Sequence, residues 1–130
     1  MRERLIQEDY IEEPWRMLVC CILLNQTSNQ QVRKVLPAVF SFVPDPDTAV
    51  NCDVDQLIQL IKSTGFSRVK AQRIMQMSHK WLEGFDEVTE LPGVGRYAHD
   101  SWKIFIQKIR DLEVTDKKLA KFLEEVRFDI

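Results

Sequence analysis

Glycine is scarce in this sequence of 130 residues: it occurs only four times, and Gly93 and Gly95 lie one residue apart. There is no low-complexity run and no internal repeat, so the chain is not a fibrous or repetitive protein. No apolar run approaches the roughly 18 residues that span a bilayer. The first residues, MRERLIQEDY, lack the apolar core of a signal peptide. These absences predict an intracellular protein without a membrane partner.

Cysteine is also rare, and the spacing of the cysteines does not indicate a metal-binding site. The three cysteines include an adjacent pair but no CxxC motif: Cys20, Cys21 and Cys52. An odd number without paired spacing favours neither a disulfide framework nor a zinc site. Buried, reduced thiols are the expected state. The two histidines, His79 and His99, have no nearby partners in sequence that suggest a metal site.

The chain has no excess of positive charge. With 18 basic and 20 acidic residues its net charge is −2, which argues mildly against a nucleic-acid partner. The charge is unevenly distributed, because 13 of the basic residues fall within 62–130. A local patch can bind phosphates on an acidic protein, although a solvated helix face is the simpler alternative. The basic clusters are Arg68, Lys70 and Arg73, and Lys117, Lys118 and Lys121.

What the sequence has in abundance is helical periodicity. Apolar residues at helical spacing predict helices around 5–10, 15–22, 32–40, 54–61, 71–82, 97–109 and 119–126. Pro14 suits the first turn of the second helix. The segment VPDPDT should end the third, and Gly84 the fifth, in which Leu82 belongs to the buried stripe. No segment alternates as a strand does. The prediction is an all-α protein with a single domain spanning 1–130.

The stretch ELPGVGRYAHDSW combines two glycines, a proline and a helix start. Glycine leaves no Cβ to block a close approach, so the backbone N–H groups of Val94, Gly95 and Arg96 should be free at the helix N-terminus. Such a helix end attracts an anion, for example a phosphate. An ordinary glycine turn between two helices is the alternative.

Three motifs in order, GFSRVKAQRI, LPGVGRYAHD and VTDKKL, resemble the signature of the helix-hairpin-helix DNA glycosylases, the endonuclease III-like superfamily. An earlier segment, LLNQTSNQQV, extends the resemblance over nearly the whole chain. The likeness is strongest to the thymine/uracil mismatch branch that occurs fused to a methyl-CpG-binding domain. It implies a compact helical glycosylase fold with the helix-hairpin-helix motif at about 86–108.

The resemblance implies a set of DNA-binding residues. The hairpin and a bound monovalent cation, Na⁺ or K⁺, would contact a phosphate. Phe66 would act as an apolar wedge between bases, with the core-capping role as its alternative. Gln26 would fill the gap left by a flipped base, although the branch resembled carries arginine there. A polar helix C-terminus is the alternative for that stretch. The implied contact residues are Gly93, Val94, Gly95, Arg96, Phe66, Ser67, Lys70, Asn25, Gln26 and Thr27.

The resemblance also implies the catalytic residues. Asp116 matches the family's catalytic aspartate, and it also stands where an N-cap is expected. Tyr97 occupies the position at which bifunctional relatives carry a lysine, and a phenol cannot form an imine. A core aromatic is the alternative for Tyr97. Asp100 is a rival carboxylate, better suited to structural hydrogen bonding. No cysteine follows Asp116, so neither an iron–sulfur cluster nor another cofactor is expected.

The function implied is that of a monofunctional DNA glycosylase that removes thymine or uracil opposite guanine and leaves an abasic site. An adenine-removing relative and a non-catalytic helix-hairpin-helix DNA-binding module are the alternatives. Asp116 separates them, because a pure binder has no need of an acid there. The expected partner is double-stranded DNA with a mismatched or damaged base, bound by a monomer. The expected compartment is the nucleus in a eukaryote, or the cytoplasm and nucleoid in a prokaryote.

Overall fold

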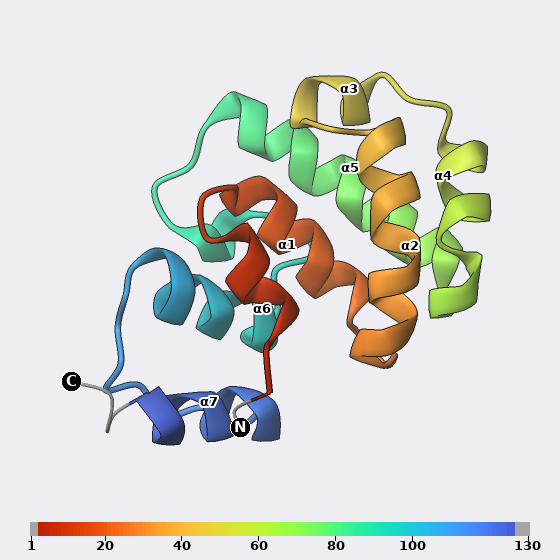
Figure 1. Cartoon of the computed structure of the whole chain (residues 1–130). Coiled ribbons are helices and arrows are strands. Elements are labelled where there is room, and N and C mark those ends of the chain that lie inside the picture. The colour runs from red at the N-terminus through yellow and green to blue at the C-terminus, as the bar shows by residue number, and fades with distance from the viewer. Residues whose placement is uncertain (1–2, 127–130) are drawn as a thin grey trace.

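The computed structural model describes residues 3–126, and these form helices and connecting loops with no strand among them (Figure 1). The all-α prediction is therefore confirmed. Short 3₁₀ helices are labelled η, and α6 continues directly into a π-helical segment, η4. In chain order the helices are η1 (Ile6–Tyr10), α1 (Pro14–Leu23), α2 (Asn29–Phe42), α3 (Pro46–Val50), α4 (Val54–Leu60), η2 (Lys62–Thr64), α5 (Ser67–Glu83), η3 (Val88–Glu90), α6 (Arg96–Ser101), η4 (Trp102–Ile106) and α7 (Lys117–Val126).

Helix α1 lies at the centre of the fold and is buried almost throughout. Between Trp15 and Leu23 only Arg16 keeps partial exposure. The helix packs against η1, α2, α5 and α6. Pro14 occupies its first turn, where the missing N–H costs no hydrogen bond, so the predicted helix start is confirmed. Burying each large apolar side chain of α1 contributes about 1.5–3 kcal/mol relative to exposure.

The proline-rich segment after α2 holds one helix that the periodicity did not predict. Helix α2 ends at Phe42, as VPDPDT predicted, but Pro46 then begins the short helix α3. Asp45 caps α3 by accepting a hydrogen bond from the Thr48 amide at 2.8 Å. A second proline, Pro37, lies inside α2 on its exposed side and does not end it. Packing of the buried face therefore outweighs the local cost of that proline.

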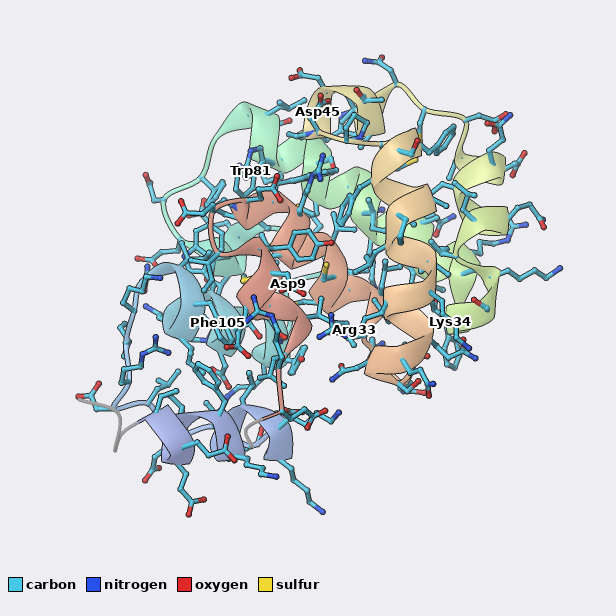
Figure 2. All side chains as sticks on the ribbon, in the orientation of Figure 1. Asp9, Arg33, Lys34, Asp45, Trp81 and Phe105 are labelled. Carbon is cyan, nitrogen blue, oxygen red and sulfur yellow. The ribbon has the colours of Figure 1, made fainter. Side chains whose placement is uncertain are left out.

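Helix α5 ends at Glu83, where Gly84 adopts a φ of +98°, as predicted. Leu82 does not belong to the buried stripe, because it is 44% exposed. Its neighbour Trp81 turns inward instead and packs against Phe85 and Trp102, with ring centroids 5.2 and 6.1 Å apart (Figure 2). The prediction for Leu82 was wrong because an aromatic cluster one position earlier sets which face of the helix is covered.

Helix α7 returns to the N-terminal part of the molecule (Figure 1). Phe122 packs on Phe105 of η4 with a centroid distance of 4.8 Å, which holds α7 against the rest of the core. One continuous cluster of buried apolar side chains runs from Leu5 to Leu123. Among the helices described, none combines the length and apolar character needed to cross a membrane.

Candidate functional site

The glycine hairpin turns the chain between η3 and α6, inside the segment 86–108 that the sequence singled out. Gly93 has a φ of +83°, which a side-chain-bearing residue rarely adopts. A Cβ at Gly93 would also lie 3.1 Å from Arg73 Cβ. Gly95 has an ordinary φ of −88° and open space around it. The two glycines therefore differ: the first is needed by the turn, and the second leaves the helix end uncovered.

The hairpin offers fewer free amides than the sequence predicted. The Val94 amide donates to Leu91 O at 3.2 Å, so it closes the turn and is not available to a phosphate. That prediction was wrong for the amide of Val94. Gly95 is the N-cap of α6 and has no side chain to satisfy the first amides. Of the three predicted amides, those of Gly95 and Arg96 are therefore the ones left at the positive end of the helix.

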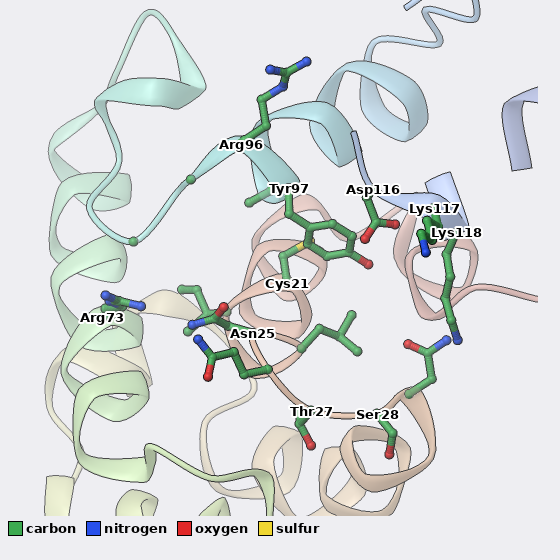
Figure 3. Close-up of a pocket in the computed structure, with 17 residues that line it drawn as sticks. Cys21, Asn25, Thr27, Ser28, Arg73, Arg96, Tyr97, Asp116, Lys117 and Lys118 are labelled. Atoms are coloured by element: carbon green, nitrogen blue, oxygen red, sulfur yellow. The ribbon is translucent and has the colours of Figure 1, made fainter. Parts of the chain in front are cut away.

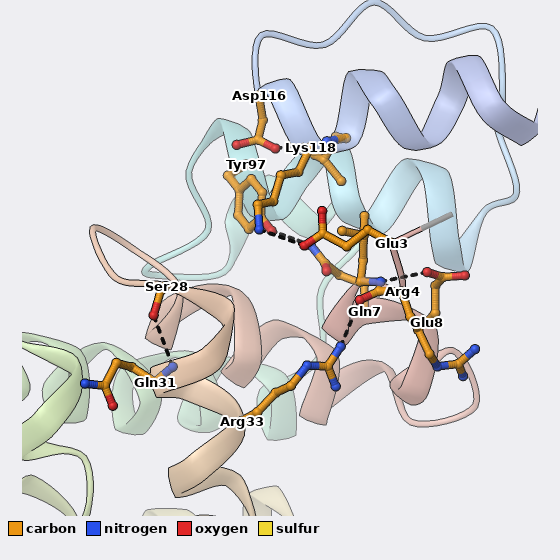
Figure 4. Close-up of polar contacts among 12 residues, drawn as sticks. Glu3, Arg4, Gln7, Glu8, Ser28, Gln31, Arg33, Tyr97, Asp116 and Lys118 are labelled. Atoms are coloured by element: carbon orange, nitrogen blue, oxygen red, sulfur yellow. Dashed lines mark hydrogen bonds and ion pairs between the residues drawn. The ribbon is translucent and has the colours of Figure 1, made fainter. Parts of the chain in front are cut away.

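Tyr97 projects from the first turn of α6 and is fixed by a partner from the other end of the chain. Gln7 Nε2 donates to Tyr97 Oη at 2.6 Å and to Ser101 Oγ at 3.1 Å (Figure 4). Burial, together with the nearby Cys21 sulfur, raises the pKa of Tyr97 well above its usual value. The phenol therefore stays protonated at neutral pH. Gln7 was not predicted, because nothing in the sequence distinguishes it; the structure shows it buried near Leu5 and Ile6.

Asp116 stands at the beginning of α7 and caps it. Its Oδ2 accepts a hydrogen bond from the Leu119 amide at 3.0 Å. The residue is half-buried, and its carboxylate lies beside the Tyr97 phenol in two different views (Figures 3 and 4). The capping bond uses one carboxylate oxygen, so the group is held in one orientation while it still borders the pocket.

Tyr97, Asp116 and the two hairpin glycines line a pocket of about 820 Å³. Its walls come from the end of α1 and the following loop, from the hairpin and α6, and from the start of α7. Burial raises the pKa of the Cys21 thiol to about 12, so Cys21 adds no charge to the wall formed by α1. Of the predicted site residues, the pocket brings together Asn25, Gln26, Thr27, Gly93, Gly95, Arg96, Tyr97 and Asp116.

Two exposed side chains of the predicted site lie on loops with strained backbones. Gln26 and Phe66 both have left-handed backbones, with φ of 57° and 48°. Phe66 is 62% exposed at the N-cap of α5, so the core-capping alternative does not hold for it. Ser67 follows as the first, half-buried residue of α5. Such conformations cost about 1–3 kcal/mol and often mark functional loops.

The predicted contact between Lys70 and DNA was wrong. The side chain of Lys70 is fully buried, and its Nζ donates to the carbonyls of Leu23 and Thr64 at 2.8 and 2.7 Å. Burial lowers the pKa of this lysine. Arg68 and Arg73, from the same basic cluster, are exposed. The three basic residues of this cluster therefore comprise two surface residues, Arg68 and Arg73, and one buried residue, Lys70.

Asp100 has the structural role that its position suggested. Its side chain is 3% exposed, with one oxygen 3.1 Å from Arg96 Nε and the other 3.1 Å from His99 Nδ1. The Arg96 guanidinium also donates to Glu113 O at 3.3 Å and points away from the Tyr97 side of the pocket (Figure 3). Asp100 does not line the pocket. The structure therefore leaves Asp116 as the carboxylate that faces it.

Positive charge borders the pocket through Lys117 and Lys118. Lys118 Nζ contacts Glu3 Oε1 at 3.0 Å, an exposed pair of modest energy (Figure 4). Within residues 3–126 no group of three histidine, cysteine or acidic side chains could hold a metal ion. The hairpin sequence LPGVG carries no acidic side chain, so only backbone carbonyls could ligate the implied Na⁺ or K⁺. That donor type suits a monovalent ion.

An all-helical fold with a glycine hairpin, an uncovered helix end and a carboxylate at the edge of one pocket defines a helix-hairpin-helix protein. Residues 19–128 match the model of the HhH-GPD superfamily base excision DNA repair proteins. The chain belongs to this family.

Individual relatives agree with that assignment. The chain is 40% identical over 102 residues to a methyl-CpG-binding domain protein 4-like protein of Arabidopsis thaliana, covering 78% of this chain and 23% of that one. It is 28% identical over 124 residues to a thymine-DNA glycosylase of Aeropyrum pernix, covering 88% and 54%. The chain therefore spans about half or less of the length of these relatives.

A solved structure of a trapped endonuclease III–DNA covalent intermediate has the same fold. The TM-score is 0.73, with 23% identity, and the match covers 84% of this chain and 55% of that one. This likeness confirms the predicted glycosylase fold.

Proposed function

We propose that this protein is a monofunctional DNA glycosylase that hydrolyses the N-glycosidic bond of a flipped thymine or uracil opposite guanine. The observation that carries the proposal is the placement of Asp116 and Tyr97 side by side at one pocket. Its volume of about 820 Å³ is ample for an extruded nucleotide. The name of the relative from Aeropyrum pernix supports thymine as the substrate base. The protein would act as a monomer on double-stranded DNA.

Asp116 supplies the chemistry in this proposal. Cleavage of the bond between C1′ and the base nitrogen builds positive charge on the sugar, and a fixed carboxylate stabilises it. The same carboxylate accepts a proton as water adds its oxygen to C1′, while the base leaves with the bonding electron pair. The Leu119 amide holds one carboxylate oxygen, which orients the group before the substrate arrives. Because the carboxylate is already oriented, it needs little reorganisation when positive charge develops on the sugar.

Tyr97 makes the proposed reaction hydrolytic. A lysine at this position would attack the sugar as an amine and form a Schiff base, which leads to strand cleavage. The phenol has no such chemistry, and its raised pKa keeps it a neutral hydroxyl. Its contact with Gln7 fixes its direction. We therefore expect this chain to form no covalent intermediate with DNA of the kind trapped in the solved endonuclease III structure.

Selection of the base would begin with unstacking. A mismatched pair costs less to open than a matched one, and the whole step costs a few kcal/mol. Phe66 and Gln26 would enter the opened stack, and their exposure on separate loops supports this proposal. The Gly95 and Arg96 amides would hold a phosphate at the positive end of α6, with a monovalent ion at the hairpin carbonyls.

The test incubates the protein with duplexes holding T·G, U·G, A·8-oxoguanine or only matched pairs, followed by alkali to cleave abasic sites. Excision from T·G and U·G is expected, with Asp116→Asn as the control for contaminating enzymes. Removal of adenine instead would identify the adenine-specific alternative. Binding without any excision would identify a DNA-binding module.

A parallel reaction without alkali, with borohydride present, tests the monofunctional assignment. The strand should remain intact and no covalent adduct should form. A trapped adduct would show that a lysine acts as nucleophile. Lys117 and Lys118, at the pocket beside Asp116, would be replaced first to locate it.

A further inference from the structure

The buried ammonium of Lys70 is unexplained by the proposed chemistry. Lysine is rarely buried, because removing its charge from water is costly unless hydrogen bonds replace the lost solvation. Here Nζ donates to two backbone carbonyls, Leu23 O at 2.8 Å and Thr64 O at 2.7 Å. Neither acceptor is a carboxylate, so the lysine is not the partner of a buried ion pair. Its contacts are made to the chain itself.

The two carbonyls lie at the starts of the two loops that carry the strained side chains, one just before the Gln26 loop and one within the Phe66 loop. Leu23 is the last residue of α1 and precedes Gln26 by three positions. Thr64 is the last residue of η2 and precedes Phe66 by two. The Lys70 backbone amide donates to Phe66 O at 2.9 Å as well. Lys70 therefore holds the Phe66 loop on both sides of its left-handed turn and fastens it to the end of α1.

This arrangement fits the energetics of the two loops. The last carbonyls of a helix lack intrahelical donors and carry partial negative charge, so a cation at Leu23 O is favourable. Left-handed conformations at Gln26 and Phe66 persist only where their surroundings hold them. A single ammonium meets both requirements at once, and its burial protects it from competing water.

We infer that Lys70 is a positioning residue that sets the spacing between the Gln26 loop (residues 24–28) and the Phe66 loop (residues 64–66), so that both side chains enter a DNA duplex together. The part of this inference that concerns DNA rests on the proposed function. The spacing itself does not, since it is a property of the free protein.

The first experiment uses no DNA. Amide hydrogen exchange is compared in the wild type, Lys70→Met and Ser78→Ala. Ser78 is a matched control, because it is a buried polar residue of α5 whose hydroxyl bonds Trp15 and Ile74, away from both loops. Reporter amides lie in or beside each loop: Asn25 and Thr27 beside Leu23, and Thr64 and Gly65 beside Phe66.

Lys70→Met should raise the exchange rates of both reporter pairs by about tenfold, the effect of losing roughly one net hydrogen bond at each. Ser78→Ala should leave those rates unchanged relative to the rest of the protein. Faster exchange in only one loop, or in neither, would overturn the inference, as would the same response to Ser78→Ala. If Lys70→Met does not fold, Lys70→Gln, which keeps two donors without the charge, is measured in its place.

The second experiment measures the affinity of the full chain for a T·G duplex and for the matched duplex, with Asp116→Asn in every protein to prevent excision. Lys70→Met should lower the ratio of mismatched to matched affinity by about tenfold and leave binding to the matched duplex unchanged. Ser78→Ala should change neither. An unchanged ratio in a folded Lys70→Met protein would overturn the inference. If the protein with Lys70 intact does not discriminate, the proposed function fails, and the exchange experiment decides the spacing role on its own.

Discussion

Gln7 Nε2 lies 2.6 Å from Tyr97 Oη, so the phenol at the pocket is fixed by a residue 90 positions away in the chain. Because burial raises the pKa of Tyr97, the folded protein keeps this proton when the unfolded chain loses it near pH 10. Above that pH the folded state binds more protons than the unfolded state, and the free energy of unfolding therefore falls as the pH rises.

We predict that Tyr97 ionises above the range of an exposed tyrosine, as measured by the ultraviolet absorbance of phenolate. The other tyrosine, Tyr10, also has a pKa raised by burial, so the Tyr97→Phe variant is needed for assignment. Tyr97→Phe should remove the later-titrating group and reduce the alkaline loss of stability. Ionisation of both tyrosines near pH 10 in the native protein would contradict the burial described.

Asp116→Asn should abolish base release and leave the fold and DNA binding intact. Asparagine keeps the oxygen that accepts the Leu119 amide bond, so α7 should still be capped. The loss of the charge and of the proton acceptor should lower the single-turnover rate by about 10² to 10⁴. Circular dichroism and a binding titration check that only the chemistry changes.

The matched control is Asp100→Asn. This residue is buried between Arg96 and His99, so its substitution should lower the free energy of unfolding by about 1–3 kcal/mol while excision persists. Loss of activity in a folded Asp100→Asn protein, with activity retained in Asp116→Asn, would reverse the site assignment.

The two hairpin glycines should respond differently to alanine. Gly93→Ala introduces a Cβ at a φ of +83° and 3.1 Å from Arg73 Cβ, and should cost about 1–2 kcal/mol of stability. Gly95→Ala meets nothing within 4 Å and should leave the melting temperature nearly unchanged. Its methyl group would stand where a phosphate approaches the amides, so DNA affinity should fall. Equal effects of both substitutions on stability would show that the turn does not depend on the φ of Gly93.

Phe66→Ala should weaken binding to a T·G duplex more than to the matched duplex, because wedge contacts exist only once the stack is open. The side chain is 62% exposed, so stability should change little. Arg73→Ala, a change of charge at the pocket, should weaken both complexes alike.

Salt dependence offers an independent measurement of the binding mode. The log–log slope of affinity against salt should be about −3 to −5 for the wild type, and shallower by about 1 for Arg73→Ala. Phe66→Ala should keep the wild-type slope. A loss of affinity by Phe66→Ala that is equal for both duplexes would argue against the wedge.

Local sequence signals predicted most of the fold because helix periodicity, proline and glycine act over a few residues. Pro14 and Gly84 mark helix ends for reasons that hold in any protein. The short helix α3 was missed because its five residues contain too little periodicity to detect. The family motifs supplied Asp116 and Tyr97, which the structure brings to one pocket, although their roles stay predictions.

The parts that sequence could not predict depend on distant partners. Nothing local to Gln7 indicates that its amide reaches Tyr97. Lys70 shares a basic stretch with Arg68 and Arg73, and its contacts with the ends of α1 and η2, which the sequence does not reveal, turn it inward. The sequence also did not reveal that the Val94 amide bonds Leu91 O. This turn is decided by backbone angles, which the residue types of the hairpin do not specify.

The contacts between Gln7 and Ser101 and between Glu3 and Lys118, 94 and 115 positions apart, have a consequence for biosynthesis. Asp116 follows the central helices in the chain, so during synthesis the residues of the core precede the carboxylate that borders the pocket. Lys118 of α7 can pair with Glu3 only after α7 has been made. A chain that stops before residue 116 would therefore contain the hairpin and Tyr97 but would lack the carboxylate that borders the pocket.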